Sequence, residues 1–167
     1  MSISSLSAAQ ISALSVTAIQ SLSATTLSSF ASTQIAAISA TGIGALSNTQ
    51  VAALSTTQVK ALTTTQIPNF SSEVSFSSPQ LLALNQVQLG AFNSTLVANI
   101  SSTAVAAFAT TQIQAFTAAN ISALDETQAG ALTATQISSL TTAQVAGLSA
   151  TDIGELNTTQ ARAFTAA

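Results

Sequence analysis

The sequence predicts an all-α fold, a solenoid or superhelix of very short helices with one helix in each eight-residue repeat. Three observations lead to this prediction: large apolar residues recur every eight positions, a helix-start signal follows each of them, and the period does not suit a continuous helix. The stretch LSTTQVKALTTTQI, from Leu54 to Ile67, shows the repeat almost twice. Self-similarity at a fixed period is the mark of a repeat architecture.

Two apolar columns define the repeat. The first column, taken as position one of each unit, holds Leu, Ile or Phe at every eighth residue from Leu6 to Leu62 and again from Phe76 to Leu156. The second column lies five residues later and is Ile, Leu or Val in 17 of 19 units, with Ala129 and Ala161 as exceptions. One unit is too small to bury a core alone, so neighbouring units are expected to stack and share one.

A continuous helix cannot keep these columns on one face. Eight residues at about 100° each exceed two helical turns by about 80°, so both columns would wind around such a helix. We therefore expect the helix to break in every unit and to last about one and a half turns.

The residues after each large apolar side chain form a helix-start signal. Position two is Ser, Thr, Asn or Asp in 17 of 19 units, and position five is Gln in 12 of 19. In a capping box, the Ser55 hydroxyl would accept from the Gln58 N–H while the Gln58 side chain returns to the Ser55 N–H. Leu54 and Val59 flank this box where a hydrophobic staple closes. Each unit is therefore expected to start a new helix.

A β-solenoid is the alternative fold. A period of eight also keeps each column on one strand face, and Thr and Ile favour strands. Abundant Ala and Gln, only six Gly for many corners, and a capping pattern that a strand does not need all favour the helical fold.

The regular spacing fails only between Phe70 and Phe76, where the unit is two residues short. This divides one continuous solenoid into a first repeat block at residues 1–69, a short irregular unit at 70–75 and a second block at 76–167. Pro68 lies where a helical N–H would be used, whereas Pro79 falls in a first turn, where its missing N–H costs little. We expect a kink or rotated junction here.

The composition excludes several classes of partner and site. The net charge is −3, and clustered Lys or Arg for nucleic acid or an anionic membrane is missing. The longest apolar run found, AVAAFA at 104–109, is far shorter than the roughly 18 residues of a membrane span. The start lacks the basic and apolar regions of a secretory signal. We expect no nucleic acid partner and no transmembrane segment.

No pattern in the sequence indicates catalysis. The chain has no Cys and no His, so the commonest general base and metal ligand are missing. We therefore expect no enzyme activity, no catalytic residue, no cofactor and no metal. Asp152 and Glu155 are three residues apart and could share a helix face as a weak cation site, but Asp152 also replaces the capping Gln after Ser149.

One surface column suggests a binding function. Position four is Thr in 14 of 19 units, and a regular Thr array is typical of ice-binding surfaces. An ice-binding or crystal-surface-binding solenoid is therefore the alternative function, although Thr in a first turn also bonds locally. The predicted ladder consists of Thr17, Thr25, Thr33, Thr41, Thr49, Thr57, Thr65, Thr95, Thr103, Thr111, Thr127, Thr135, Thr151 and Thr159.

The segments SNTQVAALSTTQVKALTTTQI and LTATQISSLTTAQVAGL resemble tandem octapeptide arrays of very large repetitive bacterial proteins. The resemblance covers nearly the whole chain and implies an exported or cell-surface protein; the cytoplasm is the alternative location. It also implies a structural role, as a rod-like or filament-like scaffold, a spacer or an adhesive segment.

The ends of the sequence carry repeat residues in register, with Ile3 at one end and Phe164 at the other. Solenoids that stay monomeric usually close with polar capping units. We therefore expect either end-to-end self-association or continuation in a longer array.

Overall fold

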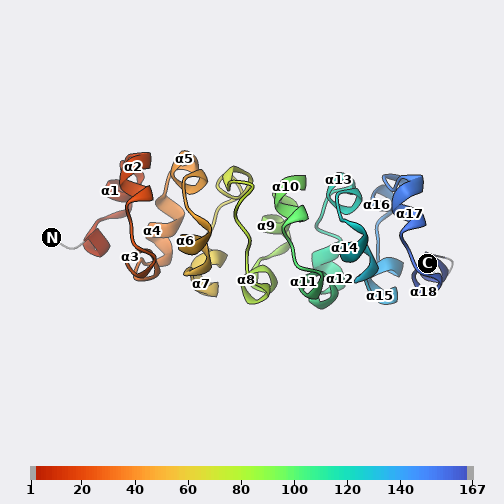
Figure 1. Ribbon diagram of the computed structural model, residues 1–167. Coiled ribbons are helices and arrows are strands. Elements are labelled where there is room, and N and C mark those ends of the chain that lie inside the picture. The colour runs from red at the N-terminus through yellow and green to blue at the C-terminus, as the bar shows by residue number, and fades with distance from the viewer. Residues whose placement is uncertain (1–2, 165–167) are drawn as a thin grey trace. The chain divides into compact units, whose positions relative to one another are not determined.

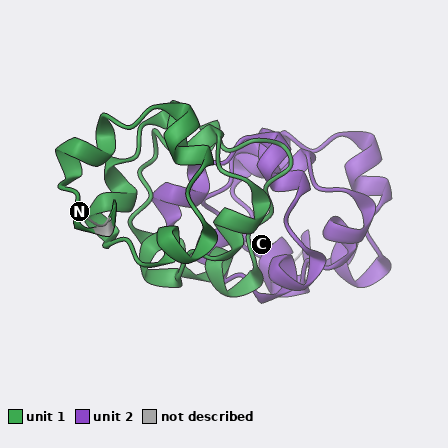
Figure 2. Cartoon of the chain, turned by 60° about the vertical axis from the view of Figure 1, so that its left-hand side comes forward, with its two compact units in different colours: residues 1–84 green, residues 85–167 purple. Residues whose placement is uncertain are grey.

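The computed structural model describes residues 3–164, and every regular element in that range is a helix (Figure 1). The all-α prediction is confirmed, and the β-solenoid alternative is wrong for the described residues. The chain divides into two compact units, residues 1–84 and 85–167 (Figure 2). The boundary falls after Leu84, and the predicted irregular unit 70–75 lies inside the first unit.

Most helices have five or six residues, which is about one and a half turns, as predicted. The elements of unit 1 are the 3₁₀ helix η1 (Ile3–Ser5), α1 (Ala8–Ser12), α2 (Val16–Gln20), α3 (Ala24–Ser28), α4 (Ser32–Ala37), α5 (Ala40–Gly44), α6 (Asn48–Ala52), α7 (Thr56–Lys60), the 3₁₀ helix η2 (Ile67–Asn69) and α8 (Ser78–Ala83).

The elements of unit 2 are α9 (Gln86–Gly90), α10 (Ser94–Ala98), α11 (Ser102–Ala107), α12 (Thr110–Ile113), α13 (Ala118–Ser122), α14 (Glu126–Gly130), α15 (Ala134–Ser138), α16 (Thr142–Ala146), α17 (Ala150–Gly154) and α18 (Thr158–Ala163).

Within each unit, a helix packs against the helix three places further along the chain. In unit 1, α1 packs on α4 and α4 on α7, while α2 packs on α5 and α3 on α6. In unit 2, α10, α13 and α16 form one such series and α12, α15 and α18 another. One turn of the solenoid therefore holds three repeats.

Capping boxes start most of the helices as predicted, whereas α2, α3, α5, α10, α11 and α13 begin without a complete box. At α7, the Gln58 N–H donates to the Ser55 hydroxyl (3.2 Å) and the Ser55 N–H donates to the Gln58 Oε1 (2.9 Å). Ala31 has no side-chain acceptor, yet its N–H still donates to the Gln34 Oε1 at 2.8 Å. The glutamine therefore serves the helix start even where the capping hydroxyl is missing.

The helices end without a left-handed residue. Many helices end at a Gly with positive φ, but no residue in the described range has positive φ. After α4, the chain instead leaves the helix through two extended residues, Ile38 (φ −61°, ψ 131°) and Ser39 (φ −60°, ψ 155°). The last carbonyl groups of each helix consequently need partners from outside that helix.

The two apolar columns form the core of each unit. In the second column, Ile35 and Val59 have no exposed surface, and in the first column Leu54 is buried. In unit 2, the Phe116 ring packs edge-on against the rings of Phe92 and Phe108, with centroids 6.3 and 5.7 Å away. The predicted core is therefore the observed one through most of the described range, although Leu124, Leu140, Leu148 and Leu156 of the first column are half-buried and Ile153 of the second is exposed.

The short unit is absorbed within unit 1. Pro68 lies in η2 and Pro79 in the first turn of α8, as expected for that residue. Between them, Val74 is fully buried, and the rings of Phe70 and Phe76 meet edge-to-face at 5.1 Å. The helix that follows this segment, α8, packs on α7. Because η2 and the short unit 70–75 lie between α7 and α8 in the chain, this contact keeps the spacing of three repeats per turn.

Candidate functional site

The glutamines at position five connect successive turns of the solenoid. The Gln58 side chain is buried, and its Nε2 donates to the carbonyls of Leu27 (3.0 Å), Ser28 (3.2 Å) and Phe30 (2.8 Å) in the turn before. Its Oε1 meanwhile accepts from the start of its own helix. One amide group thus supplies an acceptor for a backbone N–H at the start of one helix and a donor for backbone carbonyls at the end of another.

The same bonds recur along both units, and we call these residues the inter-turn glutamines. Each donates to carbonyls about one turn earlier, at separations of 31 and 28 residues for Gln66, whose acceptors are Ile35 and Ile38. The inter-turn glutamines with described bonds are Gln34, Gln50, Gln58, Gln66 and Gln80 in unit 1 and Gln128, Gln136, Gln144 and Gln160 in unit 2.

The short unit leaves this bonding pattern intact. Gln80 donates to Val51 O (2.9 Å) and Leu54 O (2.8 Å), at separations of 29 and 26 residues. Both separations are two residues shorter than the usual 31 and 28, which matches the two residues missing from the unit. The acceptors keep their repeat positions, so the deletion shortens one turn without removing its bonds.

The inter-turn role was not predicted, although the sequence contains a signal for it. A capping box accepts Glu as readily as Gln at its last position, yet none of the 19 units has Glu there. Only Gln adds two N–H donors to the acceptor that the box requires. The use of Gln in 12 units and of Glu in none indicates that a donor is needed as well.

Asp152 occupies an inter-turn position without supplying a donor. Its Oδ2 accepts from the Ser149 N–H (2.6 Å) and from the Ser122 hydroxyl (2.7 Å). Burial raises its pKa, but the hydrogen bonds from Ser122 and Ser149 outweigh that effect and hold the pKa below its ordinary value. The carboxylate cannot donate to the Ile121 and Leu124 carbonyls, which hold the usual acceptor positions.

The turns are looser at this point. A Cβ added to Gly44 would lie 2.7 Å from the carbonyl oxygen of Asn69, and one added to Gly90 would lie 3.1 Å from that of Ala115. At Gly130, which has the same repeat position, nothing lies within 4 Å. The turn that contains α17 therefore stands further from the turn before it.

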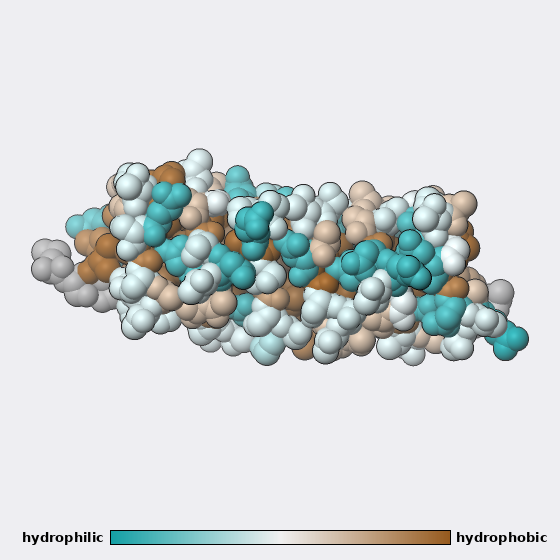
Figure 3. All heavy atoms as spheres, in the orientation of Figure 1, coloured by the Kyte–Doolittle hydropathy of each residue, from teal (hydrophilic) through white to brown (hydrophobic). Residues whose placement is uncertain are grey.

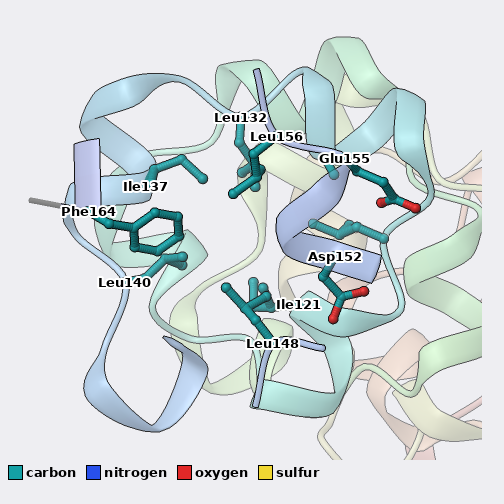
Figure 4. A pocket seen from close by; sticks show the side chains of 11 residues that line it. Ile121, Leu132, Ile137, Leu140, Leu148, Asp152, Glu155, Leu156 and Phe164 are labelled. Atoms are coloured by element: carbon teal, nitrogen blue, oxygen red, sulfur yellow. The ribbon is translucent and has the colours of Figure 1, made fainter. Parts of the chain in front are cut away.

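A cavity of about 20 Å³ lies beside this looser contact, which is room for about one water molecule. Its walls are apolar except for Asp152 and Glu155. Figure 4 shows Ile121, Leu156 and Phe164 lining it. Ala129, one of the two exceptions in the core column, also lines it. The small side chain explains part of the space.

Asp152 and Glu155 both line this cavity, and Glu155 Oε2 is buried without a hydrogen-bond partner. No three metal-ligating side chains gather within the described range. Ca²⁺ takes six to eight oxygen ligands, so two carboxylates alone are a weak basis for a cation site.

All 14 predicted threonines are exposed. Because a turn holds three repeats, they are divided among three sides of each unit. In unit 1, Thr17, Thr41 and Thr65 follow one side, and two threonines follow each of the others. Rows of two or three are short for an ice-binding surface, and this function stays a prediction.

The surface around the exposed threonines is nearly uncharged. Most of the face in Figure 3 is white or pale, with separate hydrophilic patches. Charged residues make up 4% of the chain. Within the described residues, no helix is both long and apolar enough to cross a membrane.

A family model for the ALTTAQ repeat matches residues 43–72. This match confirms a tandem short-repeat array in that part of the chain. No curated protein and no solved structure matches the chain.

Proposed function

We propose that this chain is a structural repeat protein without catalytic activity, acting as a rod-like scaffold, a spacer or an adhesive segment. The observation that carries the proposal is the inter-turn bonding, in which one repeated side chain fastens each turn to the turn before it. A chain built from such contacts gains length with every repeat while each turn contacts only its neighbours.

The composition supports a role that needs no chemistry. The chain has neither His nor Cys, and its few charges are spread over both units. Its net charge of −3 gives no basis for binding nucleic acid. We propose that its partners are further repeats of the same kind, in a longer array or in other copies.

The proposed location is the bacterial cell surface or the extracellular space, with the cytoplasm as the alternative. This location rests on the resemblance of the repeat to arrays in exported proteins. Antibody labelling of intact cells compared with permeabilised cells tests it. Labelling that requires permeabilisation would contradict a surface location.

Small-angle X-ray scattering on dilute protein tests the rod. A compact domain of this length has a radius of gyration of about 15 Å. We expect a value well above this, with the scattering profile of an elongated particle. A radius near that of a compact domain would overturn the rod-like scaffold.

A further inference from the structure

Helix α17 is held more weakly than the other helices of unit 2. The helices α12, α13, α14, α15, α16 and α18 each pack on the helix three places before them. The corresponding contact between α17 and α14 is weaker than any of these. Within residues 3–164, α17 is also the one α-helix without a buried residue. Few contacts therefore hold α17 in its place.

The turn formed by α16, α17 and α18 provides an internal comparison. Gln144 of α16 and Gln160 of α18 are buried, and each donates to two carbonyls of the turn before at 2.8 Å. At the same repeat position of α17, Asp152 is only half-buried and accepts from the Ser122 hydroxyl instead (2.7 Å). All three helices lie at the same level of the solenoid. The difference between them therefore arises from the contact with the turn beneath.

The space beneath α17 is incompletely filled. The cavity of about 20 Å³ is lined by Ala129 of α14 and by Asp152 and Glu155, and Figure 4 shows the two acidic side chains beside it. A Cβ added to Gly130 would meet nothing within 4 Å. The buried Glu155 Oε2 lacks a hydrogen-bond partner, which costs free energy while α17 is closed. Exposure of this oxygen to water removes that cost and favours opening.

The segments on both sides of α17 are fastened to other helices. Before it, Gln144 fastens α16 to the carbonyls of Ile113 and Phe116, and α16 also packs on α13. After it, Gln160 fastens α18 to carbonyls at the end of α14, and α18 also packs on α15. Helix α17 is therefore a weakly held segment between two fixed points.

We propose that α17 is a lid, which opens away from α14 as a local unit of residues 149–156 while α16 and α18 stay in place. Opening hydrates the Glu155 carboxylate and uncovers apolar groups that line the cavity, among them Ala129 and Leu132. Segments with few buried apolar contacts open in this way at a lower free energy than global unfolding. The lid goes beyond the proposed structural role, because it makes core groups of unit 2 accessible without unfolding the unit.

Native-state hydrogen exchange followed by nuclear magnetic resonance tests the lid. The probe is the Ile153 N–H in α17, and the matched probes are the N–H groups of Val145 in α16 and Ala161 in α18, at the same repeat position. We expect the protection factor of Ile153 to be at least about tenfold lower than the other two. Its exchange should hardly change with dilute urea, because a local opening exposes little surface. Equal protection at the three positions, or opening of Ile153 together with Ala161, would overturn the lid.

Two matched variants exchange the position-five side chains of α16 and α17. Asp152→Gln supplies the missing donor and should raise the protection factor of Ile153 by about tenfold. Gln144→Asp removes the corresponding donor from α16 and should lower the protection factor of Val145 by a similar factor. Circular dichroism verifies that each variant is folded. If Gln144→Asp does not fold, Asp152→Gln decides alone, because an unchanged protection factor at Ile153 would overturn the lid.

Thiol labelling gives a second, independent measurement, because the chain contains no Cys. Ala129→Cys places a thiol at the cavity beneath α17, and Val105→Cys places one at the same repeat position of α11, on which α14 packs. Both positions are buried, so a thiol reagent reaches them only after opening. We expect Ala129→Cys to be labelled at least about tenfold faster than Val105→Cys, and Asp152→Gln to slow that labelling. Equal labelling rates would overturn the lid.

Discussion

Replacing Gln58 by Glu isolates the inter-turn donor from the capping box. The carboxylate keeps the oxygen that accepts from the Ser55 N–H at 2.9 Å, so the helix start is preserved. It loses the amide hydrogens that reach Leu27 O and Phe30 O. Any loss of stability therefore reports on the contact between turns.

The loss can be estimated from the two acceptors. Leu27 O keeps a bond from the Phe30 N–H at 3.1 Å, whereas Phe30 O loses the donor that lies 2.8 Å away. A buried carbonyl left without a donor costs about 1–3 kcal/mol. The new carboxylate also faces carbonyl oxygens in a buried position, which adds a desolvation cost. We expect the free energy of unfolding to fall by at least about 3 kcal/mol at neutral pH.

Urea unfolding followed by far-ultraviolet circular dichroism measures this loss. Gln10→Glu is the matched control, because it has the same repeat position and the same box but no inter-turn acceptor in the described residues. In dilute protein it should change stability by less than about 0.5 kcal/mol. Gln58→Met removes both the donor and the oxygen that accepts from the Ser55 N–H, without adding charge, and its loss of stability should lie between the two.

The pH dependence separates charge from the lost donor. Burial raises the pKa of a carboxyl at position 58 in the folded state, so the folded chain binds more protons than the unfolded chain. The stability of Gln58→Glu should therefore fall as pH rises above the unfolded value of about 4.3. Equal losses for Gln58→Glu and Gln10→Glu at neutral pH would refute the inter-turn role.

Three further predictions concern the spacing between turns and the Asp152 side chain. Gly44→Ala should destabilise the chain by about 1–3 kcal/mol, because its Cβ would lie 2.7 Å from a backbone oxygen. Gly130→Ala meets nothing within 4 Å and should stabilise its helix by about 0.5–1 kcal/mol. The urea midpoints of the two variants measure this difference. Asp152→Gln should raise the free energy of unfolding by about 1 kcal/mol, because an amide can donate to the Ile121 and Leu124 carbonyls; an unchanged or lower urea midpoint would contradict this. Burial raises the Asp152 pKa, but hydrogen bonds outweigh that effect and lower it from 3.8. The contribution of the ionised side chain to the free energy of unfolding is therefore complete above that value and is lost as pH falls through the folded pKa. Asp152→Asn should remove this acid dependence of stability.

Much of the fold could be predicted from a single repeat. The eight-residue period excludes a continuous helix, and the hydroxyl at position two with Gln at position five predicts a helix start. Both are local signals, since Ser55 and Gln58 lie three residues apart and meet within one turn. The second apolar column is also buried as its spacing predicts, with Val59 fully inaccessible.

The number of repeats in a turn could not be predicted in this way. It depends on the direction in which the two extended residues between helices, such as Ile38 and Ser39, lead the chain. Small changes in those dihedral angles would change which helix packs on which, and no residue type in the repeat specifies them. The partners of the Gln58 amide were hidden for the same reason, because Phe30 lies 28 residues away.

The distribution of glutamine in unit 1 shows which of its two roles the sequence retains. In the first turn, position five holds Gln10, Ala18 and Thr26, and α2 and α3 still start at Ser15 and Ser23 without a glutamine. Where an earlier turn lies beneath, position five holds Gln34, Gly42, Gln50, Gln58, Gln66 and Gln80. Capping alone would favour Gln equally in both groups, because the first N–H groups of every helix need an acceptor. In unit 1, glutamine is instead concentrated where carbonyls of an earlier turn need a donor, which favours the bond between turns over the cap as the reason for its use there.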